Sequence, residues 1–233
     1  MESMKFLVSP LFEDLPGLVH GFGLRFPGTR TAAREAAREA FRDAGEIFFL
    51  RQVHGCSVAT PPWGEPPEAD ASTAKESGAL LAIETADCLP VLIVDPIRRQ
   101  VAAAHAGWRG TAARVTQSAV RALLDAGSNA ADLLVALGPS IGPCCYEVGP
   151  EVEAAFGPSG AGFFVTGAAD RKHLDVAAAN RAQLDEVGIA SSRIDSVSHC
   201  TKCREDLFFS YRRDGANAGR MISVVGFSRP SSC

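Results

Sequence analysis

The sequence predicts a mixed α+β fold in a single domain spanning residues 1–233. Predicted helices and strands alternate along the chain without a regular βαβ period. No Gly-rich dinucleotide or phosphate loop is present, and neither an internal repeat nor an interdomain linker is visible. A chain of 233 residues can bury a substantial core. These observations favour a mixed α+β domain over a doubly wound nucleotide-binding fold.

Three amphipathic helices are predicted from apolar residues spaced three and four positions apart. The first covers 31–44 and is rich in alanine, and the second covers 111–126. The third lies between Asp175, a good N-terminal capping residue, and Gly188, which is suited to ending a helix.

Short runs rich in β-branched, aromatic and leucine residues predict the strands. They span residues 47–53, 80–83, 91–94, 133–137, 163–165 and 221–225. The segment 59–77 contains four prolines, at positions 61, 62, 66 and 67, and is predicted to be a loop that arches over the surface.

Composition narrows the classes of partner. The net charge is -4, 46% of the residues are hydrophobic, and there is no block of like charge, which argues against nucleic-acid or membrane-surface binding. The apolar run 89–94 is far shorter than the roughly 20 residues of a membrane helix. No signal peptide is recognised, so we expect a cytoplasmic protein whose seven cysteines are thiols, metal ligands or nucleophiles rather than disulfides. The sequence predicts no particular oligomeric state.

A potential metal ligand ends each of three apolar runs, beside small residues or a turn. These ligands are His54, Cys88 and His105. Two imidazoles and one thiolate match the ligand count of catalytic zinc sites, in which water or substrate takes the fourth position. A lone cysteine or histidine is more often an inert buried or hydrogen-bonded residue. A metal-free pair, with Cys88 as nucleophile and His105 as base, is a rival interpretation.

Three charged residues lie next to these ligands in the sequence. Arg109 follows His105 by four residues and precedes the predicted helix 111–126, so it is a candidate phosphate clamp, the alternative being a surface ion pair. Arg51 lies three residues before His54 and is a second candidate for contacting an anion. Asp87 is expected either to orient an imidazole or to make a structural hydrogen bond.

Four further cysteines occur as an adjacent pair, Cys144 and Cys145, and as a C-x-x-C pair, Cys200 and Cys203. A second zinc ion is conceivable, but adjacent cysteines seldom serve one tetrahedral ion. The four are therefore interpreted as structural or pocket-lining residues. In a polar turn before the last strand, Tyr211, Arg212 and Arg213 are candidate substrate contacts, with a solvated surface as the alternative.

Several long motifs accompany the three ligand segments. They are Gly-Pro-Ser-Ile-Gly-Pro-Cys-Cys-Tyr-Glu-Val-Gly at 138–149, Cys-Thr-Lys-Cys at 200–203 and Phe-Phe-Ser-Tyr-Arg-Arg-Asp-Gly at 208–215. With these motifs the chain closely resembles the YfiH family, also called laccase-domain or polyphenol oxidase, peptidoglycan editing factor and purine nucleoside phosphorylase. The resemblance runs from about His20 to about Gly226, although 20–28 departs from the family's Ser/Thr-rich turn.

The resemblance implies a four-layer α-β-β-α sandwich similar to cysteine-hydrolase-like toxins, with zinc held by His54, Cys88 and His105. It also implies a purine nucleoside phosphorylase acting on adenosine and inosine, with guanosine and methylthioadenosine as further candidates, and with adenosine deamination at the same metal. We expect Cys88, His105 and Arg109 to be catalytic. Residues Arg51, Arg109, Tyr211 and Arg212 are expected to bind nucleoside and phosphate.

Two alternative activities use the same residues. The first is a cysteine-type hydrolase that edits cell-wall precursors, with Cys88 as the nucleophile. The second is a copper-dependent polyphenol oxidase, because copper competes well for nitrogen and sulfur ligands in vitro. Multicopper oxidases need about ten histidines for their copper centres, and this chain has five, so oxidase activity is expected to be slow and to require added copper.

Overall fold

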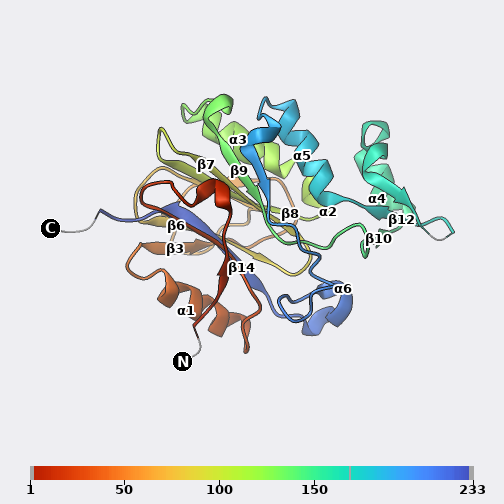
Figure 1. Cartoon of the computed structure of the whole chain (residues 1–233), viewed down its shortest axis with the longest axis horizontal. Coiled ribbons are helices and arrows are strands. Elements are labelled where there is room, and N and C mark those ends of the chain that lie inside the picture. The colour runs from red at the N-terminus through yellow and green to blue at the C-terminus, as the bar shows by residue number, and fades with distance from the viewer. Residues whose placement is uncertain (1–2, 168, 231–233) are drawn as a thin grey trace.

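Two β-sheets form the centre of the computed structural model, which describes residues 3–167 and 169–230 (Figure 1). The first sheet has the order β1 (Phe6–Leu7), β2 (Leu18–Gly23), β14 (Met221–Phe227), β6 (Ala79–Thr85) and β3 (Glu46–Phe49). The second has the order β13 (Ile194–Ser196), β9 (Leu134–Leu137), β7 (Leu89–Asp95), β8 (Gln100–Ala106), β5 (Ala71–Ala74) and β4 (Val58–Ala59). A small third sheet contains β10 (Glu147–Val148), β12 (Lys172–Leu174) and β11 (Phe164–Thr166).

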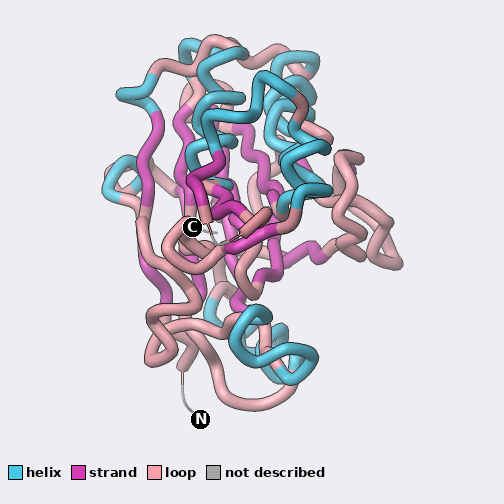
Figure 2. Tube along the Cα trace, turned by 90° about the vertical axis from the view of Figure 1, so that its right-hand side faces the viewer, coloured by secondary structure: helices cyan, strands magenta, loops and turns pink. Residues whose placement is uncertain are grey.

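Helices lie on both sides of the paired sheets. They are α1 (Arg30–Ala40), α2 (Trp108–Ala112), α3 (Val115–Asp125), α4 (Pro150–Phe156), α5 (Val176–Glu186) and α6 (Tyr211–Asp214). In Figure 1, α1 lies beyond the first sheet, and α3 and α5 lie beyond the second. Figure 2, turned by 90°, shows strands running through the middle of the molecule and most helices gathered on one side. None of the described helices is both long and apolar enough to cross a lipid bilayer.

Three apolar clusters hold these elements together. Ala33 and Ala37 of α1 pack with side chains of the first sheet such as Phe49. A second cluster joins residues of the two sheets, and a third joins the second sheet to α3 and α5. Strand β7 contributes to two of them, because alternate side chains point to opposite faces of a strand: Val91 belongs to the helix-side cluster and Leu92 to the inter-sheet cluster. The predicted mixed fold in one domain is therefore confirmed.

Most predicted elements are found, with changed ends. The third helix is α5, and the carboxylate of Asp175 accepts a hydrogen bond from the Ala178 amide at 2.9 Å, as expected of its cap. The first helix ends at Ala40, four residues earlier than predicted. The six predicted strands correspond to β3, β6, β7, β9, β11 and β14.

The helix predicted over 111–126 is found only in part, because two helices cover this region instead of one. The chain forms α2 and then α3, and Arg114 between them adopts left-handed backbone angles (φ 63°, ψ 38°). Helix α2 begins at Trp108 because Gly107 provides an extended N-cap and its carbonyl accepts the Thr111 amide at 2.8 Å. Arg109 is consequently inside a helix rather than before one.

The sequence patterns missed two central strands. Strand β8 contains three consecutive alanines, which have low β-propensity, and β5 falls within the predicted loop 59–77. The two strands pair antiparallel, with Ala71 opposite Ala104, and all seven residues of β8 are buried. Tertiary burial decides their conformation, and the small side chains let α3 pack closely on this part of the sheet.

Candidate metal centre and active site

A cavity of about 570 Å³, a size typical of small-molecule sites, opens where β6 and β8 end and where β7 begins. Of the residues predicted to act in the site, six line this cavity: His54, Cys88, His105, Arg109, Tyr211 and Arg212. Arg51 does not line it, because its exposed guanidinium pairs with Glu68 at 3.2 Å on the surface.

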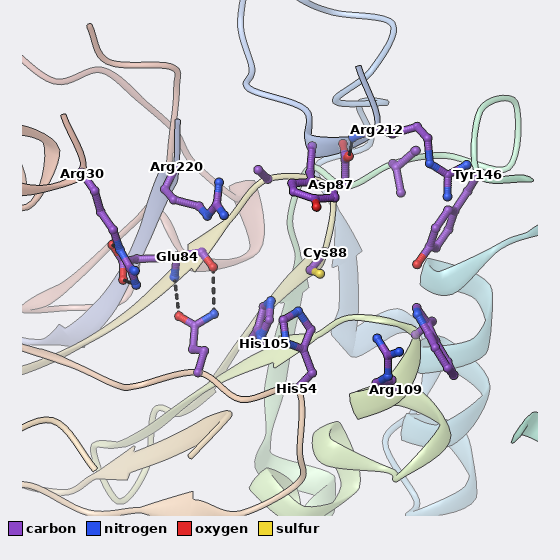
Figure 3. Close-up of a pocket in the computed structure, with 15 residues that line it drawn as sticks. Arg30, His54, Glu84, Asp87, Cys88, His105, Arg109, Tyr146, Arg212 and Arg220 are labelled. Atoms are coloured by element: carbon purple, nitrogen blue, oxygen red, sulfur yellow. Dashed lines mark hydrogen bonds and ion pairs between the residues drawn. The ribbon is translucent and has the colours of Figure 1, made fainter. Parts of the chain in front are cut away.

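The three predicted metal ligands come together at the centre of the cavity (Figure 3). Cys88 lies in the turn between β6 and β7, His105 near the end of β8, and His54 in the loop after β3. One potential ligand atom from each residue lies within 4.8 Å of those of the other two. The two imidazole rings have centroids 5.0 Å apart and planes inclined by 66°, so they converge edge to face near the thiol.

A buried carboxylate that the sequence patterns did not single out, Asp70, organises this convergence. Its Oδ1 atom contacts His105 Nδ1 at 2.8 Å and accepts the His54 amide at 2.9 Å. Its Oδ2 atom accepts the amides of Val53 at 3.0 Å and Gly55 at 2.7 Å. These contacts hold His54 in its left-handed backbone conformation (φ 62°) and leave His105 Nε2 to face the site. The only sequence signal was a single acidic residue before a strand.

The donor set and its surroundings fit a metal ion. A carboxylate that binds the far nitrogen of a ligating histidine is a common feature of zinc sites. Gly107 lies against the centre, where an added Cβ would be 2.8 Å from Cys88 Sγ, so the backbone approaches as closely as a glycine allows. Three protein ligands leave one coordination position for substrate or water, as in catalytic zinc sites.

The two imidazoles next to Cys88 favour its thiolate, which is the form that binds a metal ion. Burial raises the pKa of Cys88, but the neighbouring imidazoles of His105 and His54 lower it to about 6. Burial lowers the pKa of His105, but the Cys88 and Asp70 groups raise it to about 9. The thiolate that a metal requires is therefore available near neutral pH, and metal binding would displace the proton from the imidazole.

Arginines line the cavity on both sides of the three ligands. In Figure 3, Arg109 and Arg212 lie toward Tyr146, whereas Arg30 and Arg220 lie toward Glu84. Arg30 is paired with Glu84. Within residues 3–167 and 169–230, no carboxylate forms an ion pair with Arg109, Arg212 or Arg220. The cavity therefore carries uncompensated positive charge.

Aromatic rings hold two of these guanidinium groups in place. The Arg109 guanidinium lies 4.3 Å from the centroid of the Trp108 ring, and that of Arg212 lies 5.4 Å from Tyr146. Arg212 also donates to the Glu147 carbonyl at 2.7 Å. Both rings line the cavity that holds the predicted metal ligands, although Tyr146 was not among the predicted site residues.

Asp87 makes structural hydrogen bonds, the second of its two predicted roles, and does not orient an imidazole in the described part of the chain. Its carboxylate accepts hydrogen bonds from the hydroxyl groups of Thr201 at 2.6 Å and Ser210 at 3.1 Å, and from the amide of Arg212 at 2.7 Å. These bonds attach the 199–214 region to the turn that carries Cys88.

The second group of cysteines lies outside the cavity lining. Cys144, Cys145, Cys200 and Cys203 come together, with their sulfur atoms within 4.8 Å of one another. Of the two predicted interpretations, structural or pocket-lining, the second is therefore wrong and the first stays a prediction. Two loops, distant in sequence, meet here, as the parallel bridge between Ser140 and Cys200 shows.

Comparison with known proteins identifies relatives over most of the chain. A family model described as multi-copper polyphenol oxidoreductase laccase matches residues 29–228. A protein named purine nucleoside phosphorylase from Deinococcus radiodurans is 39% identical over 208 residues, covering 87% of this chain and 78% of that protein. A protein of unknown prokaryotic origin named adenosine deaminase RL5 is 35% identical over 200 residues, covering 78% of this chain and 76% of that protein.

A solved structure has the same fold. The crystal structure of YlmD from Geobacillus stearothermophilus superimposes with a TM-score of 0.87 at 28% identity, covering 98% of this chain and 97% of that chain. The Escherichia coli protein named purine nucleoside phosphorylase YfiH is 41% identical over 184 residues, covering 76% of this chain and 72% of that protein.

Proposed function

Because this chain belongs to the laccase-domain family that includes YfiH and YlmD, we propose that it is a zinc-dependent purine nucleoside phosphorylase. Adenosine and inosine are the proposed substrates, with guanosine and methylthioadenosine as further candidates. Phosphate oxygen attacks the anomeric carbon, the bond from that carbon to the purine nitrogen breaks, and the purine leaves with the bonding electrons and takes up a proton. The products are the free base and the sugar 1-phosphate, which is ribose 1-phosphate for adenosine, inosine and guanosine and methylthioribose 1-phosphate for methylthioadenosine.

One observation carries this proposal: guanidinium groups without carboxylate partners lie in the same cavity as a three-ligand metal centre. An unpaired arginine beside an open cavity suits a phosphate, because its planar fork can donate two parallel hydrogen bonds to phosphate oxygens. Trp108 and Tyr146 add flat faces against which a purine can stack. The named relatives support the same substrate class.

Different residues of the cavity would bind zinc and bind phosphate. His54, Cys88 and His105 would hold zinc, which when bound supplies a Lewis acid that polarises a substrate oxygen or nitrogen. Arg109 and Arg212 would hold phosphate in position for attack, which lowers the entropic cost of bringing two substrates together. Asp70 would keep His105 in the tautomer that offers Nε2 to the ion.

The test is phosphate dependence. Inosine or adenosine is incubated with the enzyme at varied phosphate, and free base and ribose 1-phosphate are followed by chromatography. We expect Arg109→Ala to lose about 30- to 1000-fold in phosphorolysis, corresponding to about 2–4 kcal/mol of transition-state stabilisation. Arg51→Ala is the matched control, since Arg51 pairs with Glu68 outside the cavity and its loss should leave the rate unchanged. Base release that does not depend on phosphate would show a hydrolase instead.

A relative named adenosine deaminase supports a second activity at the same site, the hydrolytic deamination of adenosine. This reaction needs the metal and water but no phosphate clamp. Arg109→Ala should therefore impair deamination less than phosphorolysis, which can be measured as inosine formed from adenosine without phosphate.

The cysteine-hydrolase alternative draws on the same geometry, because Cys88, His105 and Asp70 form a connected nucleophile, base and orienting carboxylate. The second imidazole, His54, favours the metal centre, since a nucleophile needs one base and not two. A cell-wall precursor turned over by metal-free enzyme would favour the hydrolase. Copper-dependent phenol oxidation would require added copper.

We also propose how the sheets and helices are layered. The three apolar clusters support a four-layer α-β-β-α sandwich. The likeness to cysteine-hydrolase-like toxins and the single domain of residues 1–233 stay predictions.

A further inference from the structure

Two turns bring four cysteines together beside the cavity. Cys144 and Cys145 lie in a turn after β9, in which the carbonyl of Gly142 accepts the amides of Cys145 at 2.9 Å and Tyr146 at 3.0 Å. Cys200 and Cys203 lie in a turn after β13, closed by the Arg204 amide bound to the Cys200 carbonyl at 3.1 Å. The turn conformation lets adjacent cysteines direct both sulfur atoms toward the opposite loop.

The spacing of the sulfur atoms matches that around one tetrahedral ion. Two thiolates each about 2.3 Å from a central zinc ion lie about 3.8 Å apart at the tetrahedral angle. Cys203 Sγ lies 3.7 Å from Cys144 Sγ and 3.4 Å from Cys145 Sγ. All four sulfur atoms fall within 4.8 Å of one another. A disulfide requires about 2.05 Å and could join these atoms only in pairs.

Backbone amides stabilise one of the sulfur atoms as a thiolate. Cys200 Sγ accepts the Gly142 amide at 3.3 Å, which links the two loops, and also the amide of Cys203. Burial raises the pKa of Cys200, but these two amides, together with the thiol groups of Cys144 and Cys203, lower it to about 7. The pKa of Cys144 is raised, by burial and then by its contacts with Cys200 and Cys203. Four thiols this close resist joint ionisation unless a cation joins them.

We propose that Cys144, Cys145, Cys200 and Cys203 bind one zinc ion as a closed tetrathiolate site, separate from the metal centre in the cavity. Four protein ligands leave no open coordination position, which is the arrangement of structural zinc sites. Binding would release the remaining thiol protons and leave a net charge of about -2 on the cluster.

The site would fasten one wall of the cavity. Tyr146, which lines the cavity, directly follows Cys145. Thr201, between the other two cysteines, donates to Asp87 at 2.6 Å, next to the ligand Cys88. The ion would therefore act on the cavity through these loops without touching substrate, and its role is structural.

The experiment measures metal content and coordination in protein purified without added metal. Wild type is compared with His105→Ala, which removes a ligand of the cavity centre, with Cys203→Ser, and with both together. Cys203 is exposed, so its replacement by serine leaves no buried polar group without a partner. Cys56→Ser is the matched control, because Cys56 is an exposed cysteine outside both clusters.

We expect two zinc ions per chain in wild type and Cys56→Ser, one in each single-site variant, and none in the double variant. X-ray absorption of His105→Ala should show four sulfur atoms about 2.3 Å from zinc and no nitrogen. This readout needs no activity, so the outcome is independent of the proposed reaction. Equal zinc content in wild type and Cys203→Ser, a nitrogen or oxygen ligand at the remaining ion of His105→Ala, or a disulfide among the four cysteines by peptide mapping would overturn the proposal.

Discussion

From the hydrogen bonds of Asp70 we predict how much zinc affinity is lost in Asp70→Asn. Asp70 is fully buried and accepts bonds from three backbone amides and from His105 Nδ1. In Asp70→Asn the amide oxygen can replace Oδ2 and keep the bonds from Val53 and Gly55. The new NH2 group then takes the place of Oδ1, where it meets the His54 amide, which is also a donor.

The substitution also changes the preferred tautomer of His105. An asparagine NH2 group donates to Nδ1 and thereby favours the proton on Nε2, the nitrogen that should face the metal. Changes to such supporting partners typically weaken metal binding by about 10- to 100-fold, or about 1.4–2.7 kcal/mol. Loss of one hydrogen bond to a charged acceptor should also lower the free energy of unfolding by about 1.5–3 kcal/mol.

The assay is competition for zinc with a chromophoric chelator, together with urea unfolding. Asp95→Asn is the matched control, because Asp95 is also fully buried and accepts the backbone amides of Ile97 and Arg98, away from the metal centre. It should lose stability but keep zinc affinity. Unchanged zinc affinity in Asp70→Asn, or an equal loss in both variants, would refute the role assigned to Asp70.

Two further substitutions test the close contact between Gly107 and Cys88 and the ion pairs of Glu84. Gly107→Ala should weaken zinc binding at least about tenfold in the chelator assay, because its Cβ would lie 2.8 Å from Cys88 Sγ, whereas Gly64→Ala, with open space around it, should bind normally. Burial alone would raise the pKa of Glu84, but its two arginine partners hold it below the ordinary 4.5. Since a lowered folded-state pKa stabilises the fold above the unfolded-state pKa, the stability difference between wild type and Glu84→Gln should be about 1–3 kcal/mol at pH 7. It should shrink as the pH falls below 4.5. A difference in urea unfolding that stays constant with pH would contradict this.

The sequence singled out three residues that the fold brings together, His54, Cys88 and His105, whose role as metal ligands stays a prediction. Each lies at the end of an apolar run beside small residues, a weak local pattern that the family resemblance strengthened. Asp70 and Tyr146 have no such pattern, because their roles depend on segments that meet only in the folded chain.

Strand β8 and the four-cysteine cluster were also missed because both depend on contacts between distant segments. The alanines of β8 carry little intrinsic preference for a strand, and their conformation follows from pairing with β5 and β7. The four-cysteine cluster joins loops separated by 58 residues between Cys145 and Cys203. Spacing along the chain could not indicate that contact.

Metal reconstitution measures whether zinc at the His54, Cys88 and His105 centre is needed for phosphorolysis. Metal-free protein is titrated with zinc or with copper, and two reactions are followed: formation of ribose 1-phosphate from inosine and phosphate, and oxidation of a phenol. We predict that zinc restores phosphorolysis in proportion to occupancy of the His54, Cys88 and His105 centre, with no phenol oxidation. Full phosphorolysis by metal-free protein, or vigorous phenol oxidation by the zinc-loaded, copper-free form, would contradict it.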